Sequence, residues 1–324
     1  MSDWSYMNIQ CRELLDKMRE EEQCFIPTTD NTDTFEATVR VEMPKVKKVA
    51  SLKVAQVYSE KAEEDAAKIP FQGAMLSLLA EEKEDISWQA LIHQVPRGVL
   101  AWAVRAGTNS LATPDNLARW GVRVDTRCRV QDCGLPSNLG HLLSGCKKSL
   151  DRFCFRHDSV LAHLVDRIVS SKAASMEVYA DLDGWRVNGG SVPSDLVATG
   201  QIPDIVLLDR VKKTIVLLEL TCPFDSSQSS FKAALDRKTL RYCRLALDCE
   251  GLGFTSYNTP LEIGARGVIT ARNHAVLAMV AGMTGIRNVK TLRRTLGKIA
   301  LLASHRIYLA RNSPDWSSGK LVTP

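Results

Sequence analysis

Two acidic residues stand inside apolar stretches that otherwise have the composition of buried β-strands. Asp204 lies near the start of the run 202–208, and Glu219 lies near the end of the run 214–220. The polar residues between the runs have the length of a hairpin connection, so we expect the runs to pair as adjacent strands. A buried carboxylate is costly unless a cation or hydrogen-bond donors meet it. Two of them on paired strands would form an oxygen-ligand site for a hard divalent ion such as Mg²⁺.

A lysine on a predicted helix supplies the third group of this site. The segment 229–248 has helical periodicity, and Lys238, Arg241 and Tyr242 are spaced so that they share one helical face. Metal-dependent phosphodiester hydrolysis needs such a set, because the acids hold the metal, the metal activates water, and the lysine stabilises a charged oxygen. An alternative stays open at this point: the acids would be ordinary strand ends, and Lys238 would be a solvated helix residue.

A second group of residues has the chemistry of a zinc site. Cys128, Cys133, His141 and Cys146 follow the pattern C-x4-C-x7-H-x4-C. Neighbouring glycines and a proline allow tight turns, and the set suits a closed tetrahedral Zn²⁺ site. A knuckle of this size cannot fold on apolar burial alone, so the metal would supply its folding energy. The alternative is a loop with incidental cysteines, although the whole chain of 324 residues has only nine cysteines and six histidines.

Composition excludes several classes of protein. The apolar content of 45% excludes wholesale disorder, and no stretch approaches the roughly 18 apolar residues that a membrane span needs. The first residues lack the basic region and apolar core of a secretory signal. The cysteines are scattered and odd in number, so we expect them to be reduced and available as metal ligands. We therefore expect a protein that is not secreted.

Positive charge is concentrated in the last quarter of the chain. The net charge is +5 overall, but residues 251–324 hold ten Lys or Arg and two acidic residues, which leaves the rest of the chain slightly negative. A basic region on a nearly neutral body suggests a polyanionic partner. A solvated helix face has the same composition, so both interpretations stay open.

The order of the predicted elements indicates an α/β fold. A long helix, a short strand, the two-carboxylate hairpin, the lysine helix and a further strand follow one another. This order is that of a restriction-endonuclease-like PD-(D/E)XK core, a mixed sheet flanked by helices, preceded by a helical region and the CCHC zinc knuckle. The expected domains are a charged, partly ordered segment at 1–68, a helical linker region at 69–120, the knuckle at 121–150, the α/β core at 151–272 and a basic helical tail at 273–324.

The chain also resembles a known family, the C-terminal region of the polyproteins of site-specific non-LTR retrotransposons, which combines a zinc knuckle with a restriction-like endonuclease. The resemblance runs from about Ile69 to about Asn273. Its motifs occur in order, and the set is specific although no member is decisive alone. They are residues 113–120 (TPDNLARW), the CCHC knuckle, 156–158 (RHD), 203–206 (PDIV), 219–225 (ELTCPFD), Arg237-Lys238 with Arg241-Tyr242, and 261–267 (LEIGARG).

The resemblance implies an endonuclease that nicks chromosomal DNA in the nucleus, so that the freed 3′ end primes reverse transcription. It implies a structural Zn²⁺ and a catalytic Mg²⁺, with DNA as partner and structured RNA as a second candidate. Asp204 and Glu219 match the family's metal-binding acids and Lys238 its catalytic lysine, and Tyr242 beside it is expected as a fourth catalytic residue. The expected nucleic-acid contacts are Arg156, His157, Arg237, Arg241 and Arg266.

Two departures from wider patterns limit this interpretation. Classical restriction enzymes place a lysine two residues after the second acid, where this chain has Thr221; Lys238 would replace it, as in the retrotransposon relatives. Residues 1–120 contain no palm pattern of a reverse transcriptase, so we expect a fragment or a domesticated remnant that cuts DNA but does not copy RNA.

Other functions remain as alternatives. The second hypothesis is a nucleic-acid-binding zinc-knuckle module whose nuclease fold is vestigial and inactive. A third is a zinc-dependent protein-interaction domain, which would make both the carboxylates and the basic region coincidences.

Overall fold

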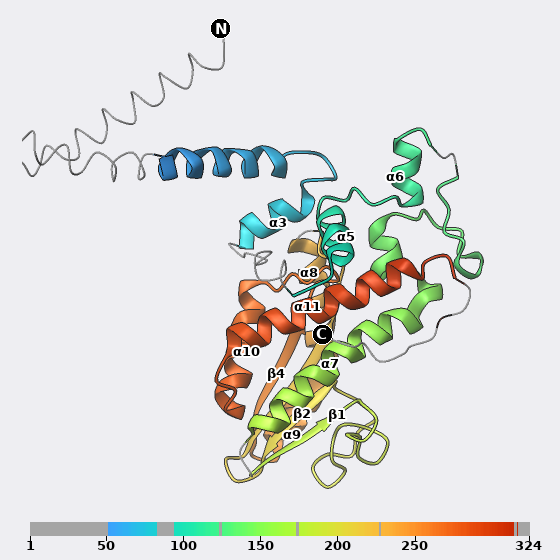
Figure 1. The fold of residues 1–324 in the computed structure, drawn as a ribbon. Helices are drawn as coiled ribbons and strands as arrows, with labels where there is room; N and C mark the ends of the chain where they lie inside the picture. The colour runs from blue at the N-terminus through green and yellow to red at the C-terminus, as the bar shows by residue number, and fades with distance from the viewer. Residues whose placement is uncertain are drawn as a thin grey trace, which may run out of the picture. The chain divides into compact units, whose positions relative to one another are not determined.

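The computed structural model describes residues 51–82, 94–122, 125–172, 175–226, 228–313 and 316. The chain divides into two compact units, Met1–Ala66 and Ala67–Pro324. Within the described part of the first unit the chain is helical and mostly exposed. The second unit contains all the elements discussed below (Figure 1). Most of the segment expected to be charged and partly ordered, and residues 83–93 of the expected helical linker region, lie outside the described residues.

The described residues form one four-stranded mixed sheet in the order β1-β2-β3-β4. Strand β1 (Met176–Ala180) pairs antiparallel with β2 (Ile205–Asp209), which forms an antiparallel hairpin with β3 (Thr214–Thr221). Strand β4 (Thr255–Glu262) runs parallel to β3. The Asp209 side chain accepts hydrogen bonds from the backbone of Val211 and Lys212 and closes the hairpin. The expected pairing of the two apolar runs is thus confirmed.

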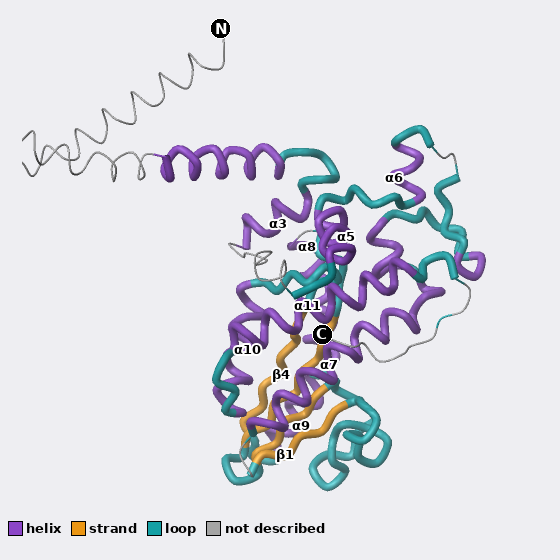
Figure 2. The backbone as a smooth tube through the Cα atoms, viewed as in Figure 1, coloured by secondary structure: helices purple, strands orange, loops and turns teal. Residues whose placement is uncertain are grey.

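Helices cover both faces of the sheet (Figure 2), which is why β2 is buried along its whole length. Alternate residues of the hairpin point to opposite sides. Ile205 and Leu207 join a core with α7 (Leu150–Ser171), α10 (Ala271–Thr284) and α11 (Val289–Leu309). Val206 and Leu208 join a core on the other side with α9 (Cys243–Gly251). The α/β class, with a mixed sheet between helices, is therefore confirmed.

The predicted lysine helix is broken in two. Helix α8 (Gln228–Arg241) ends before Tyr242, and α9 begins after it. Tyr242 adopts φ −110° and ψ 8° at the break, and its side chain is fully buried beneath the sheet. At the break the Tyr242 ring enters the core, while Lys238, one turn earlier, stays partly exposed.

The C-terminal segment is not a tail. Helices α10 and α11 supply buried residues to the main core, and α11 packs along α7. Gly297 of α11 lies so close to the loop before α10 that a Cβ there would approach the carbonyl oxygen of Gly267 to 2.7 Å. The expectation of a separate basic tail at 273–324 is therefore wrong: only one side of these helices is basic, and the other side completes the core.

A second, smaller core joins the N-terminal helices and the Cys/His segment to the same unit. The helices before this segment are α3 (Ala74–Glu82), α5 (Arg97–Gly107) and α6 (Pro114–Arg119), which is capped by the Thr113 side chain. Trp102 of α5 packs with Leu143 of the Cys/His segment and Ile307 of α11. The boundaries expected at 120, 150 and 272 therefore do not separate compact units. No helix among the described residues is long and apolar enough to cross a bilayer.

Candidate functional site

Asp204 and Glu219 meet at one end of the β2–β3 hairpin. The register pairs Ile205 with Leu218, so Asp204, just before β2, lies across from Glu219. The Asp204 backbone N–H donates to Oε2 of Glu219 at 3.2 Å, and the Leu220 backbone N–H donates to Oδ2 of Asp204 at 2.6 Å. Both side chains are buried. The structure thus brings together the two acids that the sequence singled out, and each acid is held by the other's strand.

Two cations of α8 approach Glu219 from the opposite side. The Lys238 ammonium donates a hydrogen bond to Oε1 of Glu219, and Nη1 of Arg241 lies 3.6 Å from the same oxygen. Burial, and then the neighbouring Asp204 charge, raise the pKa of Glu219, while Lys238 acts in the opposite direction. The Arg241 side chain is 57% exposed and the Lys238 side chain 27%. Both cations are therefore accessible to a ligand that enters beside Glu219.

Tyr242 positions the backbone next to the acids. Its hydroxyl donates to the carbonyl oxygen of Ile202 at 2.8 Å, which ties the break between α8 and α9 to the segment that leads into Asp204. Burial, together with the Glu219 charge, raises the pKa of Tyr242 far above its ordinary value, so the phenol stays neutral. The structure brings Tyr242 to the site, but its hydroxyl is engaged by the backbone.

His157 of α7 lies at the same site, against Asp204. Its Nε2 is 3.1 Å from Oδ2 of Asp204, and its Nδ1 is 2.9 Å from Oδ1 of Asp158. Burial opposes a charge on the ring, but hydrogen bonds to Asp158 and Asp204 outweigh it and raise the pKa of His157 to about 11. The sequence marked residues 156–158 as one motif but did not connect it to the acids, because the contact spans 47 residues of chain.

Two of the arginines that we expected to contact nucleic acid are buried and bond to other parts of the protein. The Arg156 guanidinium, 1% exposed, donates to the carbonyl oxygens of Leu143 and Cys222. Arg266, 3% exposed, forms an ion pair with Asp225 at 2.8 Å. A nucleic acid cannot reach either group without unpacking the core, so the expected contact role of Arg156 and Arg266 is wrong. The side chain of Arg237 lies outside the described residues.

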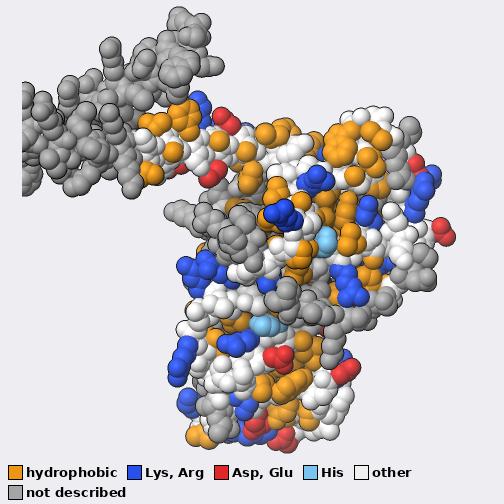
Figure 3. Space-filling model, viewed as in Figure 1, with side chains coloured by type: hydrophobic (Ala, Val, Ile, Leu, Met, Phe, Trp, Pro, Cys, Tyr) orange, Lys and Arg blue, Asp and Glu red, His pale blue; other side chains and the backbone are white. Residues whose placement is uncertain are grey.

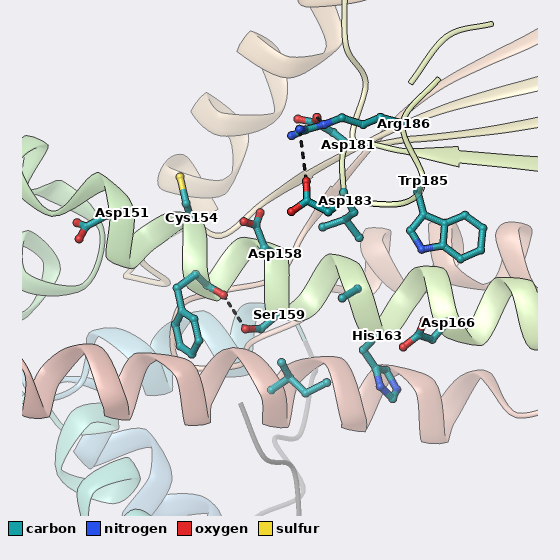
Figure 4. A pocket seen from close by; sticks show the side chains of 14 residues that line it. Asp151, Cys154, Asp158, Ser159, His163, Asp166, Asp181, Asp183, Trp185 and Arg186 are labelled. Carbon is teal, nitrogen blue, oxygen red and sulfur yellow. Dashed lines mark hydrogen bonds and ion pairs between the residues drawn. The ribbon is translucent and has the colours of Figure 1, made fainter. Parts of the chain in front are cut away.

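Beyond His157, an acidic pocket of about 850 Å³ opens between α7 and the loop after β1 (Figure 4). Figure 4 shows Asp158 and Asp166 on α7 and Asp181 on the loop. Arg186 binds Asp181 at 2.7 Å and only partly neutralises the group. This negative charge repels phosphates, so a nucleic acid would approach Asp204 from the α8 side rather than through the pocket. The aspartates that line it are Asp151, Asp158, Asp166, Asp181 and Asp183.

The four residues of the CCHC pattern converge as a possible metal site. Their ligand atoms all lie within 4.8 Å of one another. Cys128 and Cys133 lie on a tight turn that is closed by hydrogen bonds from Cys128 N to Leu135 O and from Gly134 N to Cys128 O. The turn needs Gly134, whose φ is +70°. His141 and Cys146 bracket a single turn of π-helix, and Cys133 Sγ is 3.5 Å from Nε2 of His141. Three cysteines and a histidine in this arrangement can bind a metal such as zinc.

The Cys/His cluster packs against the rest of the second unit. Leu142 and Leu143, between its ligands, are buried in the second core with α5 and α11. A Cβ on Gly140, the residue before the histidine, would come within 3.1 Å of the Phe224 ring. Phe224 follows β3, so the cluster packs directly against the segment that leads out of the candidate active site.

We expect the purified protein to contain about one Zn²⁺ per chain. His141→Ala or Cys133→Ser should release it, since a three-ligand site binds zinc far more weakly, and should loosen α5 and the end of α11 along with residues 125–149. Elemental analysis and hydrogen exchange measure the two effects. Cys154→Ser, an exposed cysteine outside the cluster, should change neither. Stoichiometric zinc in a Cys128/Cys133 double variant would contradict the assignment.

Comparison with models of known protein families finds no match to this chain, and comparison with characterised proteins finds none either.

Proposed function

We propose that the chain is a metal-dependent DNA endonuclease of the PD-(D/E)XK type. The observation that carries this proposal is the convergence of Asp204 from the residue before β2, Glu219 from β3 and Lys238 from α8. A structural ion pair would need one acid and one cation. Here two buried acids lie side by side, and Lys238, Arg241 and His157 approach them from two different helices.

The donor set fits a hard divalent ion. Both acids offer carboxylate oxygens, the ligands that Mg²⁺ prefers. Within the described part of the chain, both hydrogen bonds to the Asp204 carboxylate fall on Oδ2, which leaves Oδ1 for an ion. When bound, Mg²⁺ would activate water and neutralise charge on the scissile phosphate. The usual position of the lysine, two residues after the second acid, holds Thr221 at the end of β3, and Lys238 reaches Glu219 from α8 instead.

The chain's own groups have separate tasks in this reaction. Asp204 and Glu219 would hold the ion through their carboxylate oxygens. The Lys238 ammonium, which contacts Glu219 in this structure, would place its charge beside the phosphate oxygen and stabilise the transition state. Arg241, which is largely exposed beside it, binds an adjacent phosphate. Burial of the two carboxylates strengthens their interactions with these cations.

We expect the exposed side of α11 to bind further phosphates of the DNA backbone. Lys290, Arg294 and Lys298 are four residues apart and share one face. No acidic residue occurs between Ile263 and Pro314. Lys290 lies in the first turn of α11, where a cation opposes the helix dipole at a cost of roughly 0.3–1 kcal/mol, so helix stability does not account for it. In Figure 3 Lys and Arg side chains border the edge where α10 lies in Figure 1.

Neutralising this face should weaken DNA binding for all sequences alike. For Lys290→Gln with Arg294→Gln, the slope of log affinity against log salt should flatten by roughly 0.9 for each phosphate that the variant no longer binds. Fluorescence anisotropy over a salt series measures the slope. The control is Lys212→Gln with Arg244→Gln, exposed cations already paired with Asp209 and Asp248. An unchanged slope would mean that this face is only solvated. Substitutions test this face better than a C-terminal truncation would, because a truncation would remove helices that form the core.

In the family that the sequence resembles, such an enzyme nicks chromosomal DNA, so we propose that this chain cleaves DNA in the nucleus. The second candidate is a nucleic-acid-binding module with an inactive nuclease fold. The observation in its favour is the position of Arg127 and Arg129 beside the Cys/His cluster, where both side chains are largely exposed and share a single acidic partner, Asp125. Both functions predict DNA binding, but only the first predicts cleavage.

Supercoiled plasmid distinguishes the two. The zinc-loaded wild-type protein should convert it to nicked or linear DNA with Mg²⁺ or Mn²⁺, and should bind without cutting in Ca²⁺. Binding without any cleavage in Mg²⁺ and Mn²⁺ would favour the inactive module.

A further inference from the structure

We infer that His157 is a positioning residue for Asp204, backed by Asp158, and not a contact for nucleic acid. The inference deepens the proposed function and rests on it. The sequence motif that contains His157 had implied a nucleic-acid contact, but its neighbours Arg156 and Asp158 face different surroundings. Arg156 is enclosed by the core, and Asp158 borders the acidic pocket. His157 lies between them and reaches the candidate active site.

The contacts of the ring define the role. Oδ2 of Asp204 is held by two donors from different elements, the Leu220 N–H of β3 at 2.6 Å and the His157 ring of α7 at 3.1 Å. Two donors on one oxygen restrict the rotation of the carboxylate and leave its other oxygen, Oδ1, outside these two hydrogen bonds. The contact of Nδ1 with Asp158 at 2.9 Å fixes the ring in turn. A carboxylate held through an ordered histidine is a better metal ligand than one that rotates freely.

Helix α7 is a rigid base for such a contact. It is 22 residues long, and residues such as Leu161 and Leu164 bury its inner side in the main core. Arg156, next to His157, fastens the same turn through hydrogen bonds to Leu143 and Ser304. The position of the His157 ring is therefore set by a helix that is packed into the core. This rigidity is what a positioning residue requires.

The two acids are thus supported from opposite sides. The α7 histidine meets Asp204, and the α8 cations meet Glu219. Lys238 and Arg241 are accessible enough to exchange Glu219 for a phosphate. The His157 side chain is 25% exposed and contacts carboxylates on both of its nitrogens, so it has no free donor to offer a phosphate. His157 therefore holds the metal-binding carboxylate of Asp204 in place, whereas Lys238 and Arg241 are available to bind the phosphate of the substrate.

The test measures Mn²⁺ affinity by electron paramagnetic resonance, without DNA, and the Mg²⁺ concentration for half-maximal plasmid nicking. His157→Ala should weaken Mn²⁺ binding and raise the Mg²⁺ requirement by about 10–100-fold, the usual effect of losing a residue behind a metal ligand. DNA affinity in metal-free buffer should not change. His157→Gln, whose amide can still donate to Asp204, should recover most of the loss. Asp158→Asn should have a smaller effect of the same sign.

Two results would overturn the inference. A His157→Ala protein with normal Mn²⁺ affinity and Mg²⁺ requirement but weakened metal-free DNA binding would overturn the inference and restore the nucleic-acid contact. A His157→Gln protein as impaired as His157→Ala would also overturn it, because the donated hydrogen bond would not be what matters. If His157→Ala does not fold, the comparison of His157→Gln and Asp158→Asn with wild type still decides. Absence of nicking by wild type would contradict the proposed function alone, since the Mn²⁺ affinities test His157 without cleavage.

Discussion

Asp204→Ala is expected to abolish DNA cleavage while DNA binding persists or tightens. The substitution removes one of two metal-holding carboxylates, so the ion and the nucleophile it activates are lost. It also removes a negative charge that repels the phosphate backbone, while Lys238, Arg241 and the basic face of α11 remain. Plasmid nicking in Mg²⁺ and DNA affinity in metal-free buffer give the two quantities. Together they separate binding from catalysis.

The control must address folding, because Asp204 accepts a hydrogen bond from Leu220 at the end of β3. Asp204→Asn keeps the size of the side chain and one oxygen, and should cleave as poorly as Asp204→Ala with less loss of thermal stability. Asp181→Asn removes a charge from the nearby pocket and should leave cleavage intact. Cleavage by Asp204→Ala at the wild-type rate would refute the nuclease assignment.

Lys238→Ala should reduce the cleavage rate by on the order of 10²–10³, the effect of removing one preorganised charge-stabilising donor. The loss should persist at saturating Mg²⁺, because the lysine acts on the reacting phosphate and not only on metal affinity. Without Lys238, the buried Glu219 carboxylate also loses its nearest cation, so the pKa of Glu219 should rise further. Single-turnover rates across a Mg²⁺ series separate these two contributions.

Lys232→Ala provides the matched control, because Lys232 is an exposed lysine on the same helix. It should leave the single-turnover rate unchanged. Lys238→Arg should recover part of the rate, since the charge is kept but the shape of the donor differs. A rate for Lys238→Ala within a few-fold of wild type at saturating Mg²⁺ would mean that the lysine only balances the charge of Glu219.

The hairpin and its acids could be predicted from sequence because they depend on local patterns. Two apolar runs with a polar connection specify antiparallel pairing, and the register then places Asp204 beside Glu219. The Cys/His cluster was predictable for the same reason, since its ligands lie within one short segment. The helix spacing also indicated the shared face of Lys238 and Arg241. The break at Tyr242 was not predicted, because it follows from burial of the ring in a core built by other segments.

Contacts between residues that are far apart in the sequence, and the burial that results from them, could not be predicted from the sequence. Arg156 bonds to Ser304, 148 residues away, and Arg266 bonds to Ala106. An arginine in a motif looks the same whether it meets phosphate or a carbonyl oxygen. Likewise, the net charge of the last quarter of the sequence indicated the exposed cations of α11. It gave no indication of the apolar opposite face, where Leu296 and Ile299 pack against the sheet and α7. Composition reports charge, and tertiary packing decides which side of a helix faces solvent.

The most direct measurement on the central claim counts the Mn²⁺ ions that the acids bind, without any need to know the DNA target. Zinc-loaded wild type and an Asp204→Asn/Glu219→Gln double variant would be titrated in parallel and monitored by electron paramagnetic resonance. The aspartates of the acidic pocket are the same in both proteins, so the difference between the two titrations reports the site itself. We predict that wild type binds one or two more Mn²⁺ ions than the variant. Identical titrations would contradict a metal site at Asp204 and Glu219.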